Sequence, residues 1–166
     1  MLRKIAFALV VGALLWIGVR AIVGAFASDE DRITARLEAA CEGFGATRMN
    51  PILEFLAPTF VDETSGFRRE DVRGAIASAF FGERDPETKA FPYRASVVPD
   101  SLVIQVARPA AETAEIAFKI RITDTRGGAE RVAWEFGLRG TLTNAESGWQ
   151  LVRATHDTAS GSWKLR

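Results

Sequence analysis

Residues 114–142 read AEIAFKIRITDTRGGAERVAWEFGLRGTL, and this stretch contains two alternating runs on either side of a glycine pair. The apolar positions are Ile116, Phe118, Ile120 and Ile122 in the first run and Val132, Trp134, Phe136, Leu138 and Leu142 in the second. Because successive side chains point to opposite faces of a strand, this period of two predicts two half-buried strands. Gly127 and Gly128 predict the turn between them, since glycine adopts positive φ without a steric penalty.

The turn also predicts a register for this hairpin. A three-residue loop at 126–128 makes every pair of facing residue numbers sum to about 254, with Ile120 opposite Trp134. Two pairs of opposite charge follow from this register and favour it, namely Lys119 with Glu135 and Glu115 with Arg139. One face of the hairpin is then apolar and must be covered by a second layer. We expect Trp134 at the centre of that interface, next to Ile120.

Length and charge limit the class of protein. A chain of 166 residues has room for one domain and a targeting segment. Three of its 21 basic residues precede Ser28, which leaves 18 basic against 21 acidic residues in 28–166. A slightly acidic domain lacks the basic surface that nucleic-acid binding needs, so we expect no nucleic-acid partner.

The composition also argues against metal and phosphate chemistry. The chain has one cysteine, Cys41, and one histidine, His156, so it has neither an intrachain disulfide nor a cluster of metal ligands. No glycine-rich phosphate loop or nucleophile elbow is present. We therefore expect no metal and no cofactor, and we interpret Cys41 as a small apolar residue on a helix.

The first 27 residues are predicted to be a targeting segment. Residues 5–27 are apolar except for Arg20, and Arg3 and Lys4 precede them. The segment is either a signal peptide cleaved after Ala27 or an uncleaved anchor long enough to cross the bilayer, and we favour the anchor. With either interpretation the basic N-terminus stays in the cytoplasm, so we expect residues 28–166 to be extracytoplasmic or, after cleavage, secreted or periplasmic.

Three helices are predicted before the strands begin. The first starts at Ser28 or Asp29 and ends near Gly43 or Gly45, with Ile33, Leu37, Cys41 and Phe44 at helical spacing. Asn50 and Pro51 mark the start of a short second helix, which Pro58 ends. The third runs over about 69–81, and Gly82 closes it.

Antiparallel strands make up the second half of the predicted domain. Alternation favours strands over 93–98 and 102–106, then the hairpin, and a last strand from Trp149. We therefore predict an α+β domain over 28–157, behind a transmembrane helix, in which three helices pack on a curved antiparallel sheet. Residues 158–166 are predicted to be a flexible tail.

Three segments resemble the nuclear-transport-factor-2-like superfamily, which includes polyketide cyclases, ketosteroid isomerases and limonene epoxide hydrolases. They are Phe60-Val61-Asp62, the opening of the third helix at Arg69-Glu70-Asp71-Val72, and Gly148-Trp149-Gln150-Leu151-Val152. The resemblance covers about residues 30–157 and implies a cone in which the helices close a pocket against the sheet. The residues expected to line this pocket are Phe44, Phe55, Phe80, Phe118, Ile120, Trp134 and Phe136.

Few residues in this pocket are candidates for catalysis. Polyketide-cyclase-like members carry histidines in the last strand, but Arg153 and Thr155 occupy those positions here. The remaining candidates are Asp62, Tyr93 and His156, with Asp157 beside the last. The resemblance places Asp62 near the pocket mouth, and its alternative role is to cap amides in a turn. We interpret His156 as lying at a fraying strand end.

Two functions remain open. The favoured one is a tethered, noncatalytic module that binds a small apolar ligand or an envelope protein, similar to the periplasmic subunits of type IV secretion systems. The alternative is an isomerase, cyclase or hydrolase that uses a carboxylate in the cone. A raised pKa of a buried Asp62 would favour the enzyme, and full exposure of Asp62 would favour the module.

The charged outer face of the hairpin suggests a further partner. The predicted register puts Ala117 opposite Gly137, which leaves a low spot rimmed by charges of both signs. A self-complementary low spot fits a second copy of the chain across a two-fold axis, so two interpretations stay open for this face, a homodimer through the sheet and a solvated surface.

Overall fold

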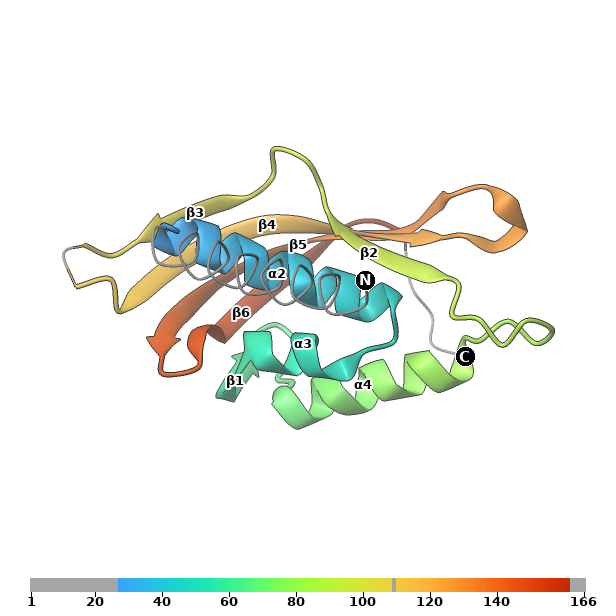
Figure 1. Ribbon diagram of the computed structural model, residues 1–166, viewed down its shortest axis with the longest axis horizontal. Coiled ribbons are helices and arrows are strands. Elements are labelled where there is room, and N and C mark those ends of the chain that lie inside the picture. The colour runs from blue at the N-terminus through green and yellow to red at the C-terminus, as the bar shows by residue number, and fades with distance from the viewer. Residues whose placement is uncertain (1–26, 109, 162–166) are drawn as a thin grey trace, which may run out of the picture.

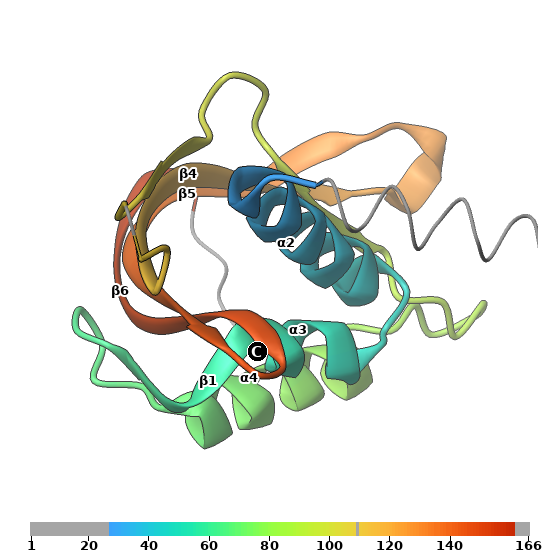
Figure 2. The same cartoon turned by 60° about the vertical axis from the view of Figure 1, so that its left-hand side comes forward.

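Three helices pack against the concave face of a curved six-stranded sheet (Figures 1 and 2). The computed structural model describes residues 27–108 and 110–161. The predicted α+β class with three helices is confirmed. The anchor predicted for residues 5–27 lies outside the described residues, except for Ala27. Within the described part of the chain, no helix combines the length and apolar character needed to cross a bilayer.

Helix α2, Asp29–Gly45, begins where the sequence predicts. The Ser28 hydroxyl accepts from the backbone N–H of Asp31, and the Asp31 carboxylate accepts from the Ser28 backbone N–H in return. The apolar face of α2 is buried, and Ile33 is fully inaccessible to solvent. The helix lies across the concave face of the sheet in Figure 2.

Helices α3, Met49–Phe55, and α4, Arg69–Gly82, form the other part of the helical layer. The predicted start of α3 is wrong by two residues, because Arg48 and not Asn50 is the N-cap and Pro51 lies inside the first turn of the helix. The end of α4 at Gly82 agrees with the prediction. The Arg69 guanidinium donates twice to the carbonyl of Leu53 and so joins the end of α3 to the start of α4.

The sheet is mixed and not antiparallel throughout. Its strands are β1 Leu56–Asp62, β2 Tyr93–Val97, β3 Val103–Val106, β4 Thr113–Asp124, β5 Arg131–Ala145 and β6 Gly148–Gly161. The order is β1-β6-β5-β4-β2, with β3 also paired to β4. Strand β1 is parallel to β6, and this pairing corrects the antiparallel prediction. Strand β6 also continues past Asp157 to Gly161, into the predicted tail.

The hairpin of β4 and β5 forms, but its register differs from the predicted one by two residues. Ile120 faces Phe136 and Ile122 faces Trp134. A bulge in β5, opposite the step from Ile122 to Thr123 in β4, leaves Ala133 without a partner, so the alternation of the two runs could not determine the pairing. The predicted pairs Lys119–Glu135 and Glu115–Arg139 are wrong. Arg121 pairs with Glu135 at 2.9 Å, and Glu115 accepts from the Thr141 hydroxyl.

The predicted low spot on the outer face is also absent. Ala117 faces Arg139, and Gly137 lies between Lys119 and Asp157. The Asp157 carboxylate occupies the space above Gly137. The feature on which we based a homodimer through this face is therefore not present.

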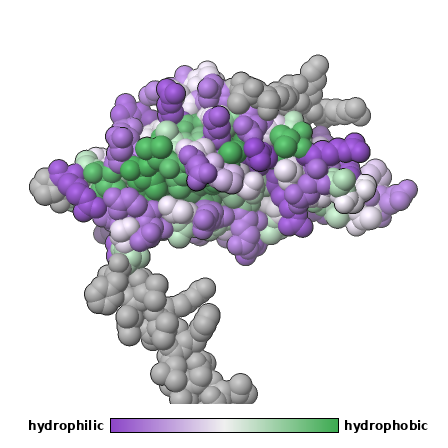
Figure 3. Space-filling model, turned by 90° about the horizontal axis from the view of Figure 1, so that it is seen from above, coloured by the Kyte–Doolittle hydropathy of each residue, from purple (hydrophilic) through white to green (hydrophobic). Residues whose placement is uncertain are grey.

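The core lies between the helices and the concave face, and it encloses Trp149 at the start of β6. Trp149 is 1% exposed, and its indole N–H donates to Asp29 at the start of α2 over 3.2 Å. Trp134 is only partly buried and stacks on Phe136 with ring centroids 4.5 Å apart. The prediction that Trp134 occupies the centre of the interface is wrong, because Trp134 faces Ile122 instead of Ile120 and is only partly buried. On the face seen in Figure 3 most of the surface is hydrophilic, and apolar residues gather in local patches.

Candidate ligand-binding cavity

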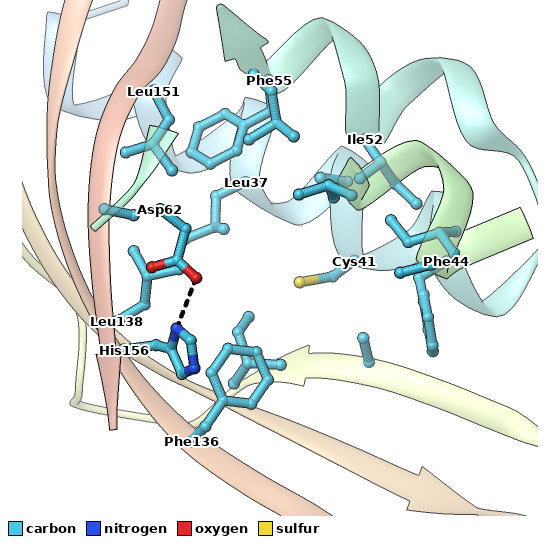
Figure 4. Close-up of a pocket in the computed structure, with 18 of the residues that line it drawn as sticks. Leu37, Cys41, Phe44, Ile52, Phe55, Asp62, Phe136, Leu138, Leu151 and His156 are labelled. Carbon is cyan, nitrogen blue, oxygen red and sulfur yellow. Dashed lines mark ion pairs between the residues drawn. The ribbon is translucent and has the colours of Figure 1, made fainter. Parts of the chain in front are cut away.

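A cavity of about 430 Å³ lies between the helical layer and the concave face of the sheet (Figure 4). Helices α2, α3 and α4 supply one wall, and strands β4, β5 and β6 supply the other. The lining side chains are aliphatic, or are the rings of phenylalanine and Trp134, except for Asp62, His156 and the thiol of Cys41. Its volume lies within the range of small-molecule sites, roughly 300–1,000 Å³.

Six of the seven residues expected to line the cone lie in the cavity wall. They are Phe44, Phe55, Phe118, Ile120, Trp134 and Phe136. Phe80 does not line the cavity and instead packs on Phe44 and Phe91 in an aromatic cluster, with ring centroids 5.7 and 5.1 Å away. Other lining residues, among them Leu138 and Leu151, lie on strand faces that the alternation already marks as apolar.

Asp62 ends β1 and enters the cavity at one end. Its Oδ1 accepts from the backbone N–H of Thr64 at 3.0 Å, and its Oδ2 accepts from the Ser65 hydroxyl. Asp62 therefore caps the turn between β1 and α4, which is the alternative role considered for it. Its side chain is only 13% exposed.

Asp62 shows neither the raised pKa expected for an enzyme nor the full exposure expected for a noncatalytic module. Burial raises the pKa of this carboxyl, but the hydrogen bonds from Ser65 and Thr64, together with His156, bring the pKa below its ordinary value. Asp62 is thus buried and ionised at neutral pH. A carboxylate stabilised in this way is a weak general base by itself, so the simple carboxylate mechanism loses support.

His156 lies in the middle of β6 and not at a fraying end. Its Nδ1 is 2.9 Å from Oδ2 of Asp62, and both side chains line the cavity. Figure 4 shows the pair at one end of the cavity, with His156 beside Phe136. The structure thus joins two residues 94 positions apart, because β1 and β6 are parallel neighbours.

Tyr93 is separate from this pair. Its hydroxyl accepts from the Arg126 guanidinium at 2.7 Å and lies 3.4 Å from the Glu83 carboxylate. The pKa of Tyr93 is raised, mainly because the hydroxyl is buried, although the nearby Arg126 guanidinium acts to lower it. Tyr93 does not line the cavity, and it anchors the β4–β5 turn to the start of β2.

Cys41 is buried on α2, with its sulfur directed into the cavity in Figure 4. Burial, with a smaller contribution from Glu38, raises the pKa of this thiol to about 11. The thiol is therefore protonated at neutral pH and a poor nucleophile. Among residues 27–108 and 110–161, no group of three or more histidine, cysteine or acidic side chains could hold a metal ion.

Comparison with solved structures supports the predicted fold. An NTF2-like protein with a cystatin-like fold from Novosphingobium aromaticivorans matches 89% of this chain and 90% of its own, with a TM-score of 0.62 and 15% identity. NTF2-like proteins from Cytophaga hutchinsonii and Salmonella enterica match 80% and 81% of this chain, with TM-scores of 0.57 and identities of 12% and 10%. These matches cover 99% and 94% of the two proteins.

No protein-family model and no curated protein sequence matches the chain. At identities of this size the structural matches establish a fold and not an activity. The chain has the cone-shaped NTF2-like fold that its sequence resembles.

Proposed function

We propose that this protein binds a small, mainly apolar molecule in its cavity. The observation that carries the proposal is a cavity of about 430 Å³ whose lining is apolar except near the Asp62–His156 pair. Burial of apolar ligand surface would supply most of the affinity, at roughly 25 cal/mol per Å² before the costs of association. The polar pair at one end would orient the bound molecule.

A bulky residue on α4 should block this binding. Ala75 lines the cavity, whereas Ser78, on the same helix, is exposed and does not line it. We expect Ala75→Trp to weaken binding of the apolar fluorescent probe N-phenyl-1-naphthylamine at least tenfold, because the indole fills part of the cavity. Fluorescence titration of the full-length chain measures this affinity.

Ser78→Trp is the matched control, and it should bind the probe as the wild type does. Equal affinities in the two variants, or no saturable binding by the wild type, would contradict the proposal. Native mass spectrometry of the purified chain would add a separate observation if a small molecule accompanies it.

We also propose that this binding domain is tethered to a membrane and lies outside the cytoplasm. The support is the apolar segment 5–27 with Arg3 and Lys4 before it. Cleavage after Ala27 would instead release the domain. A noncatalytic module in the cell envelope, which takes up a small apolar ligand or contacts an envelope protein, fits both arrangements.

A reporter fusion tests this location. Alkaline phosphatase attached after Arg166 should be active, because it requires disulfides that form outside the cytoplasm. A cytoplasmic reporter at the same position is the control and should be inactive. The reverse pattern would overturn the orientation, and the intact mass of the membrane fraction would show whether residues 1–27 are retained.

The Asp62–His156 pair supports a second candidate function, which is proton transfer on the bound molecule. The 2.9 Å contact aligns the imidazole, and an aligned imidazole is the commonest general base in enzymes. In this alternative His156 takes the proton, and Asp62 only positions the ring.

A further inference from the structure

The hydrogen bonds of Asp62 determine which nitrogen of His156 carries a proton. The carboxylate is ionised and can only accept, so the nitrogen 2.9 Å from Oδ2 must donate. Nδ1 of His156 therefore carries the proton. In the neutral imidazole the other nitrogen, Nε2, then has a free lone pair.

Nε2 is the polar atom that the cavity can offer to a ligand. Among the residues that the structure describes, no group donates a hydrogen bond to it, and His156 lines the cavity with its ring beside Phe136 (Figure 4). The oxygens of Asp62 already accept from Thr64, Ser65 and His156. The remaining wall is apolar around this end of the cavity.

We propose that the cavity selects apolar molecules that carry a hydroxyl group, and that this hydroxyl donates a hydrogen bond to Nε2 of His156. This inference rests on the proposed binding function and names the class of ligand for the same site. A molecule whose oxygen only accepts would leave Nε2 without a partner when it enters, and an unpaired buried acceptor costs free energy. Asp62 acts as a positioning residue, because it fixes the tautomer without contacting the ligand.

A matched pair of probes tests the hydroxyl preference in the full-length chain. 2-Naphthol and 2-methoxynaphthalene share one ring system, but only the first can donate a hydrogen bond. The wild type should bind 2-naphthol about tenfold more tightly, as expected for one hydrogen bond. In His156→Phe the two affinities should become similar, because the ring shape remains while the acceptor is lost.

Asp62→Asn tests the positioning role. An asparagine that keeps its Oδ1 on the Thr64 N–H turns its amide N–H₂ toward Ser65 and His156, the partners of Oδ2 in the wild type. The imidazole must then accept at Nδ1 and carry its proton on Nε2. This variant should lose the preference for 2-naphthol and still bind 2-methoxynaphthalene.

Nitrogen-15 NMR reports the tautomer directly. His156 is the only histidine, so its two ring nitrogens give unambiguous signals when the affinity tag contains no histidine. The wild type should show the proton on Nδ1, and Asp62→Asn should show it on Nε2. The wild-type spectrum remains decisive if either variant fails to fold, which circular dichroism would reveal.

The outcomes separate the two proposals. A wild type that carries the proton on Nε2, or binds the two probes with the same affinity ratio as His156→Phe, overturns the hydroxyl preference alone. A wild type that binds neither probe saturably overturns the proposed function as well.

Discussion

Replacing Trp149 with alanine should lower the free energy of unfolding by about 3–5 kcal/mol, as for other large aromatic residues removed from a core. Trp149 is 1% exposed, at the start of β6, and is packed beneath α2. The substitution also leaves the Asp29 carboxylate without the indole N–H that it accepts. For a domain of ordinary stability, roughly 5–15 kcal/mol, such a loss is a large fraction of the total. Urea denaturation followed by circular dichroism measures it.

Trp134→Ala is the control for this prediction. Trp134 is partly buried, lines the cavity and stacks on Phe136, so its removal enlarges an existing space instead of opening a new one in the core. We expect a cost of about 1–2 kcal/mol, near the centre of the distribution for point mutants. A Trp134→Ala loss equal to that of Trp149→Ala would mean that the observed register of β4 and β5 is wrong.

These two tryptophans show what the sequence could and could not predict. Alternation in the hairpin correctly placed Trp134 on the concave face, because parity depends only on local spacing. Its depth depended on the register, which differs by two residues: the turn, where Asp124 faces Arg131, shifts the pairing by one residue, and the bulge that leaves Ala133 unopposed shifts it by one more. Trp149 is at the very start of the last strand, directly after a glycine turn, so no local pattern marked it as more buried than Trp134.

The start of α2 and the end of α4 were predicted more accurately because their signals are local. The capping box at Ser28 and the glycine at the end of α4 lie within a few residues of the ends that they define. The parallel pairing of β1 with β6 has no comparable signal, since it joins segments about 90 residues apart along the chain.

The candidate site followed from that unpredicted pairing. Asp62 and His156 were each candidates from the sequence, but neither spacing nor composition brought them together. The last strand was also predicted to fray near His156, whereas β6 continues to Gly161 and keeps this side chain in the cavity wall.

Gly140 lies on β5 in close contact with the backbone of β6. A Cβ at this position would overlap the carbonyl oxygen of Arg153 and lie 2.7 Å from Cδ1 of Leu151. The cause is a bulge in β6, where Thr141 faces Arg153 but Leu142 faces Leu151, so that Val152 is the extra residue. A backbone oxygen cannot rotate away as a side chain can.

Gly140→Ala should therefore destabilise the protein by about 1–3 kcal/mol, the usual cost of overpacking. The displaced backbone of β6 pairs with β1 through Ala154 and Asp62, so the preference for 2-naphthol should also fall. Urea denaturation and the paired probe titration measure these two effects.

Gly137→Ala is the matched control on the same strand. A Cβ there would meet only the Asp157 side chain on the outer face, and this carboxylate can rotate into solvent. Alanine also loses less conformational entropy than glycine in a strand, so this variant should be neutral or slightly stabilised. If Gly140→Ala proves as stable as Gly137→Ala, then β5 and β6 do not approach as closely at the bulge as the structure shows, and the alignment of Asp62 with His156 must be set by other contacts.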